Sequence, residues 1–161
     1  MVGTVSDLAP LSGLVHLTRL NLSANQVTDL RPLSGLDGLT LLTLVGNPLR
    51  DVTPVMGLKN LVTLRLGHTL VRDLSQFREF EGHCDLSLDS DSLSDLSGLA
   101  GSTNLTGLDL SANEISDLTP LAGLTGLTSL LVRGNPLDCA AQAANLDALN
   151  AGGVAVTSDC L

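Results

Sequence analysis

Residues 14–35 read LVHLTRLNLSANQVTDLRPLSG, and residues 36–57 follow the same pattern as LDGLTLLTLVGNPLRDVTPVMG. In both segments leucine stands at the first, fourth, seventh and ninth positions, and asparagine stands at the twelfth. Self-similarity at a fixed period, here 22 residues, indicates a repeat architecture. Each unit of such a protein buries its apolar side chains only by stacking on its neighbours.

Four independent columns of residues agree on this period. The asparagine column holds Asn25, Asn47, Asn113 and Asn135, with Thr69 and Asp91 at the two intervening positions. The aspartate column is unbroken and holds Asp7, Asp29, Asp51, Asp73, Asp95 and Asp117. The glycine column holds Gly13, Gly35, Gly57, Gly101 and Gly123, interrupted by Glu79. The proline column holds Pro10, Pro32, Pro54 and Pro120, interrupted by Gln76 and Gly98. We therefore expect one domain over residues 1–161, with a partial repeat (1–13), six repeats (14–145) and a C-terminal cap (146–161).

The pattern LxxLxxLxLxxN resembles the leucine-rich repeat, and its 22-residue spacing with DLxPL resembles the internalin-like and phosphatase-regulator-like subclass. This resemblance implies an α/β solenoid with a parallel β-sheet on the concave face, short 3-10 turns on the convex face and a C-terminal helical cap. It also implies that the asparagines form a buried ladder, because an amide offers both a donor and an acceptor to the backbone of the turn. Thr69 and Asp91 can do only part of that work.

Within each repeat the residue types suit their expected places. The segment LxL predicts a short strand with alternating side chains, so Leu20 and Leu22 point inward while Arg19 points outward. The aspartates are expected to cap the helical turns; the alternative is an exposed acidic stripe. Proline fits the first turn of a helix because its φ is preset, and the glycine column suits a left-handed turn.

The two ends of the chain differ. Residues 140–150 predict a short helix and GGVAV (152–156) a last strand, bracketed by Cys139 and Cys160. We interpret these two cysteines as a disulfide that staples the cap, with two reduced thiols as the alternative, and Cys84 as a small packing residue. At the other end the core is expected to open at Val5, Leu8 and Leu11, so that either upstream sequence or another chain covers it.

The middle of the chain departs from the pattern. His83 stands where a core leucine is expected, and Phe77 and Phe80 replace leucine with larger groups. Repeat drift with repacking explains this, and a functional locus is the alternative; His83 is expected to be partly buried rather than a ligand. The acidic run 85–91 lacks the glycine and the terminal glutamate of an EF-hand loop, so we expect no metal and no cofactor.

The outward positions of the strands define the candidate binding surface. The residues expected to contact a partner are Arg19, Leu41, Thr43, Arg65, Asp85, Ser87, Asp89, Asp109, Leu131 and Arg133. Their acidic centre predicts a protein partner with a basic surface; the alternative is an ordinary solvated face that binds no partner. The chain contains no nucleophile elbow, P-loop, dinucleotide or zinc-protease motif, so an enzyme is not expected.

Charge and hydropathy restrict the function further. The formal net charge of −9 argues against a nucleic-acid partner, because phosphate binding needs clustered Lys and Arg. No apolar run is long enough for insertion into a bilayer. Three classes of function remain: a secreted or cell-surface recognition module, a cytoplasmic regulatory scaffold, and an architectural segment of a larger protein.

Overall fold

The computed structural model describes residues 3–80 and 82–160, and these residues form one seven-stranded parallel sheet in chain order. The strands are β1 (Arg19–Asn21), β2 (Leu41–Thr43), β3 (Thr63–Arg65), β4 (Cys84–Ser87), β5 (Leu105–Asp109), β6 (Ser129–Leu131) and β7 (Ala155–Thr157). Neighbouring strands pair one repeat apart, so that Leu20 lies beside Leu42 and Leu42 beside Leu64. The solenoid with a parallel sheet is therefore confirmed.

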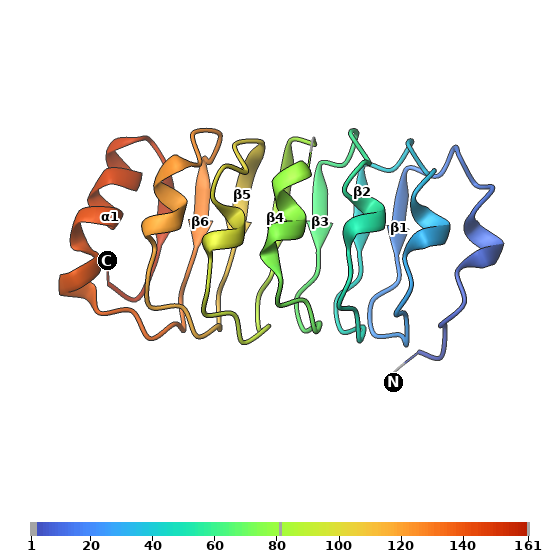
Figure 1. Ribbon diagram of the computed structural model, residues 1–161, viewed down its shortest axis with the longest axis horizontal. Helices are drawn as coiled ribbons and strands as arrows, with labels where there is room; N and C mark the ends of the chain where they lie inside the picture. The colour runs from blue at the N-terminus through green and yellow to red at the C-terminus, as the bar shows by residue number, and fades with distance from the viewer. Residues whose placement is uncertain (1–2, 81, 161) are drawn as a thin grey trace.

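Short helical turns form a second layer across one face of the sheet (Figure 1). The 3-10 helices are η1 (Ala9–Leu11), η2 (Arg31–Leu33), η3 (Thr53–Val55), η4 (Leu74–Glu79), η5 (Ser97–Leu99) and η6 (Thr119–Gly123). The leucine and valine columns lie between the two layers and make up a single buried cluster. The opposite face of the sheet is the concave face, and it carries the outward side chains of every strand.

The asparagine ladder is present between the repeats. Asn47 is 1% exposed, and its Nδ2 donates to the carbonyls of Leu22 and Leu44 at 2.9 and 2.8 Å. Its Oδ1 accepts a hydrogen bond from the backbone N–H of Val27 at 3.0 Å. The two asparagines of the C-terminal repeats make the same bonds. One amide thus links its own turn to the preceding repeat, which satisfies backbone groups that the core excludes from water.

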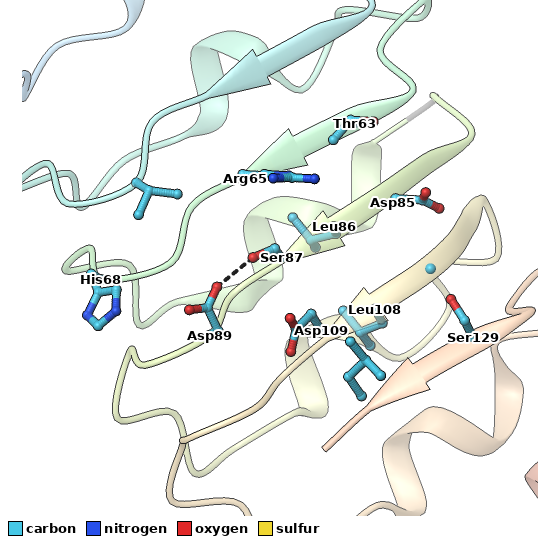
Figure 2. A pocket seen from close by; sticks show the side chains of 13 residues that line it. Thr63, Arg65, His68, Asp85, Leu86, Ser87, Asp89, Leu108, Asp109 and Ser129 are labelled. Carbon is cyan, nitrogen blue, oxygen red and sulfur yellow. Dashed lines mark hydrogen bonds between the residues drawn. The ribbon is translucent and has the colours of Figure 1, made fainter. Parts of the chain in front are cut away.

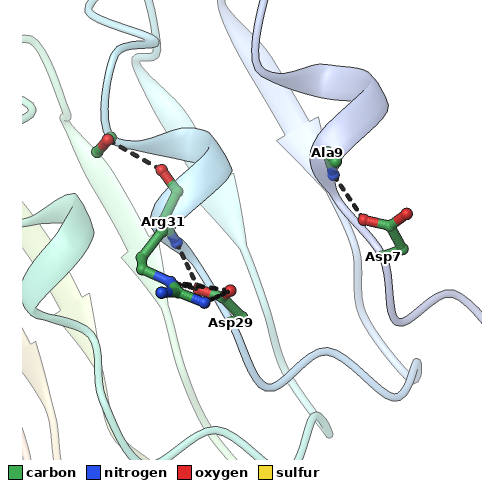
Figure 3. A network of polar contacts seen from close by, with 5 residues as sticks. Asp7, Ala9, Asp29 and Arg31 are labelled. Carbon is green, nitrogen blue, oxygen red and sulfur yellow. Dashed lines mark hydrogen bonds and ion pairs between the residues drawn. The ribbon is translucent and has the colours of Figure 1, made fainter.

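The aspartate column binds the starts of the helical turns, as expected, although only Asp73 is itself the N-cap residue and the other five stand one residue before it. Each of the six carboxylates accepts a hydrogen bond at 2.8–2.9 Å from the backbone N–H two residues later. Figure 3 shows this bond at Asp7 and at Asp29, where Arg31 adds an ion pair at 2.7 Å. The hydrogen bond from the Arg31 side chain is the main cause that lowers the pKa of Asp29 to about 2.

The prediction of a left-handed turn at the glycine column is wrong for four of its five glycines, because only Gly101 has a positive φ, of 90°. The other four need no left-handed residue, since the right-handed turn continues through further hydrogen bonds such as Leu14 N–H to the carbonyl of Leu11. Every full repeat instead has a left-handed residue immediately before the asparagine column. These residues are Ala24, Gly46, His68, Ser90, Ala112 and Gly134.

The expected burial of His83 is also wrong: His83 is exposed, and Cys84 is buried in its place. Cys84 pairs with Leu105, which stands one period after His83, and the register then shifts so that Asp85 lies opposite Gly107. This bulge turns the imidazole out to water, where its two nitrogens need no buried partner. The thiol behaves as a small apolar group, and burial raises its pKa to about 12.

Gln76 and Gly98, which interrupt the proline column, both have a structural role. The Oε1 atom of Gln76 accepts a hydrogen bond from the backbone N–H of Val52 at 2.8 Å. Gln142, one period after the last proline of the column, accepts the equivalent bond from Leu118 at 3.0 Å. Gly98 packs directly against the backbone of the preceding repeat, with no room for a Cβ. Together with the burial of both phenylalanines, these contacts favour repeat drift with repacking.

The ends of the solenoid are closed unequally. Helix α1 (Cys139–Ala151) covers the C-terminal end, and a disulfide joins Cys139 to Cys160, as expected. At the N-terminal end Val5 is 44% exposed and Leu11 is half-buried, as expected, whereas Leu8 is 1% exposed, contrary to expectation, and belongs to the core cluster. Leu14 and Val15 are also exposed, at 47% and 51%.

Candidate binding site on the concave face

A hollow of about 640 Å³ lies on the concave face and extends across β3 to β6 (Figure 2). It is lined by Val45, Thr63, Arg65, His68, Asp85, Leu86, Ser87, Asp89, Gly107, Leu108, Asp109, Ser129 and Leu131. Figure 2 shows His68 and Asp89 toward one end, Asp85 toward the other, and Arg65 and Asp109 between them. The hollow therefore combines acidic, basic and apolar side chains from five consecutive repeats.

Two glycines lie directly against acidic side chains of this hollow. A Cβ at Gly107 would lie 2.7 Å from Oδ1 of Asp85 and 3.0 Å from Oγ of Ser129. A Cβ at Gly67 would overlap the carboxylate of Asp89. The two acidic side chains thus lean over the neighbouring strands, where a longer side chain would push them away.

Neutral donors orient the acidic side chains of the hollow. Asp85, Asp89 and Asp109 each accept one hydrogen bond through Oδ1. The donors are the hydroxyl of Thr106, the hydroxyl of Ser87 and the backbone N–H of Ser111, at 2.8, 2.6 and 3.0 Å. No arginine or histidine among residues 3–80 and 82–160 forms an ion pair with these three carboxylates. A carboxylate has about four acceptor sites, so each keeps the capacity to bind a cation.

His68 is a residue of the hollow that the sequence reasoning missed. It is exposed and has a φ of 56°, a backbone conformation in which histidine is more common than most residues. Its backbone N–H donates to the carbonyl of Asp89 at 3.0 Å, which fixes it at the rim. The sequence does contain a signal for it: His68 stands immediately before the asparagine column, where the other repeats have alanine, glycine or serine.

The structure places the ten expected partner-binding residues on the concave strands or directly after them, but it does not bring all of them together. The hollow gathers Arg65, Asp85, Ser87, Asp89, Asp109 and Leu131. The lining does not include Arg19, Leu41, Thr43 or Arg133. Leu131 is 40% exposed, so an apolar group is available beside the charges.

Other kinds of site have less support in the described part of the chain. There, no group of three or more His, Cys, Asp or Glu side chains is arranged to hold a metal ion. None of the described helices has the length and the apolar character needed to span a bilayer.

Solved structures with the same architecture connect this site to known proteins. An internalin (inlF) from Listeria monocytogenes superimposes with a TM-score of 0.79 at 30% identity, over 96% of this chain and 44% of that one. An internalin C2 from the same species gives 0.76 at 29% identity, over 98% of this chain and 71% of that one. A leucine-rich-repeat protein from Leptospira interrogans gives 0.76 at 22% identity, over 91% and 38%. No protein-family model and no curated protein sequence matches the chain.

The chain has the leucine-rich-repeat fold, and it is similar in sequence and architecture to these internalins. It spans less than half the length of the first internalin, so the activity and partners of such whole proteins do not transfer directly to it. What the similarity supports is a protein-binding module.

Proposed function

We propose that this chain is a secreted or cell-surface recognition module that binds another protein through its concave face. The observation that carries the proposal is the hollow across β3 to β6. In it, Asp85, Asp89 and Asp109 are oriented by neutral donors and make no ion pair with a described arginine or histidine. A lysine or arginine of the partner would supply the opposite charge, and Leu131 would pack against its aliphatic part.

The energetics of such a contact follow from the composition of the face. The chain contains no Trp and no Tyr, the residue types that most often dominate binding energy. Charge complementarity then contributes mainly to specificity and to the association rate. We expect binding that weakens steeply as the salt concentration rises.

Selection from a displayed peptide library tests this proposal. The wild-type protein should enrich peptides with Lys or Arg, whereas Asp85→Lys with Asp109→Lys should lose them and keep the wild-type circular dichroism and melting temperature. The matched control is Asp37→Lys with Asp147→Lys, which makes the same change in net charge at exposed positions outside the hollow. Equal loss in both variants would show general electrostatic attraction, and no loss in either would refute the concave site.

The disulfide supports the secreted or cell-surface location. A structural disulfide persists in oxidising compartments and is rare where glutathione keeps thiols reduced. Intact-mass thiol counting after equilibration in a cytosol-like glutathione buffer tests this part separately. Retention of the Cys139–Cys160 bond favours the secreted module, whereas reduction of this bond, which gives three free thiols together with Cys84, favours an intracellular scaffold.

A further inference from the structure

Asp91 is an acidic residue at an interior position of the asparagine ladder. It is 1% exposed, and its Oδ1 accepts hydrogen bonds from the backbone N–H of Thr69 at 2.5 Å and from the Thr69 hydroxyl at 3.2 Å. Its Oδ2 is buried and has no hydrogen-bond partner among the described residues. A buried polar atom without a partner is rare and calls for a physical explanation.

The regular ladder positions show which bond Asp91 lacks. The carbonyl of Leu22 accepts hydrogen bonds from the amides of both Asn25 and Asn47. The carbonyl of Leu110 likewise accepts bonds from the amides of the last two ladder asparagines. The equivalent carbonyl two periods after Leu22 belongs to Leu66, and Thr69 and Asp91 occupy its two amide positions. An ionised carboxylate only accepts hydrogen bonds, whereas a protonated one carries an O–H donor.

We propose that Asp91 is a pH-sensitive latch between the third and fourth repeats. With a proton on Oδ2, Asp91 donates a hydrogen bond toward the carbonyl of Leu66, for which neither ladder position supplies an amide. Its Oδ1 accepts the hydrogen bonds from Thr69. On ionisation it loses that donor and becomes a buried charge, which weakens the contact between the turns that follow β3 and β4. These turns carry His68 and Asp89 at the rim of the hollow, so the latch controls the rigidity of that rim.

The surroundings of Asp91 determine the direction of the pH dependence. Burial is the largest influence and raises the pKa of Asp91; the negative charge of Asp89 adds to it, while hydrogen bonds from Thr69 and the charge of Arg72 oppose it. Because the pKa is raised in the folded state, the latch stabilises the protein fully below the ordinary aspartate range. Its contribution is lost as the pH rises from that range through the folded pKa. Asp29 acts in the opposite direction and at lower pH, since its pKa is lowered to about 2.

Carboxyl ¹³C chemical shifts of Asp91 in the folded wild-type protein test the latch directly. We expect the protonated shift to persist above the ordinary aspartate range. As the pH rises from the ordinary aspartate range through the folded pKa of Asp91, the protection of the Thr69 amide against hydrogen exchange should fall. The total fall should be about tenfold for each unit by which the folded pKa exceeds the ordinary one. If the chemical shift shows that Asp91 is already ionised at pH values within the ordinary aspartate range, the proposal is overturned.

The variant Asp91→Asn provides the second measurement. It places the regular ladder residue at this position, so the melting temperature at neutral pH should rise. The loss of Thr69 amide protection with rising pH should disappear. The control Asp147→Asn removes the same charge from an exposed position of α1 and should keep the wild-type pH dependence. If Asp91→Asn retains the wild-type pH dependence, ionisation of Asp91 does not loosen this junction.

Discussion

The asparagine ladder makes a quantitative prediction for Asn47→Ala. The substitution removes the acceptor of the Val27 N–H and the donor to the Leu44 carbonyl, whereas the Leu22 carbonyl keeps the amide of Asn25. Two buried backbone groups are left without a partner, and each such group costs about 1–3 kcal/mol. We therefore expect the free energy of unfolding to fall by roughly 2–6 kcal/mol.

Urea denaturation followed by circular dichroism measures this loss. The matched control is Asn25→Ala, because Asn25 is half-buried and its Oδ1 accepts from the exposed backbone of Val5, where water can replace the bond. The control should lose about 1 kcal/mol or less. If Asn47→Ala costs no more than Asn25→Ala, the buried ladder does not contribute to stability as argued.

Two further predictions concern packing and the C-terminal cap. Gly98→Ala should lower the melting temperature, because the added Cβ would overlap the backbone of Leu74. The control Gly57→Ala should leave the melting temperature unchanged or raised, since nothing lies within 4 Å of its Cβ. Equal melting temperatures of the two variants would contradict the close approach at Gly98. The Cys139–Cys160 bond closes a sequence separation of 21 residues, so its reduction should lower the free energy of unfolding by about 3 kcal/mol. Hydrogen exchange should then increase first in α1. A uniform increase along the chain would contradict a local staple.

The repeat architecture could be predicted because periodic positions repeat the same physical task. Leucine at fixed spacing, aspartate before each turn and asparagine after four of the first six strands are signals that several repeats give independently. Two local features were predicted wrongly for a common reason. The burial of His83 and the left-handed glycines both depend on how the backbone continues, through a bulge in one case and a continued right-handed turn in the other.

The candidate site could be predicted only in part. Strand alternation placed Asp85 and Asp109 on the concave face, since successive side chains point to opposite faces. The close approach of Asp85 to Gly107 and of Asp89 to Gly67 could not be predicted, because strand alternation does not show how side chains from adjacent strands lean over one another. His68 was missed because it lies outside the strand pattern.

The sequence by itself determined the 22-residue period and the aspartate caps, because each residue repeats the environment of its equivalent one turn away. The resemblance to leucine-rich repeats implied the parallel sheet and the asparagine ladder, and the cysteine pair was predicted from its position around the cap, with reduced thiols as the alternative. Only the tertiary structure decided where the face is hollowed, that Cys84 replaces His83 in the core, and that Oδ2 of Asp91 is left without a partner. Those outcomes depend on contacts between unlike residues of neighbouring repeats, which periodicity does not specify.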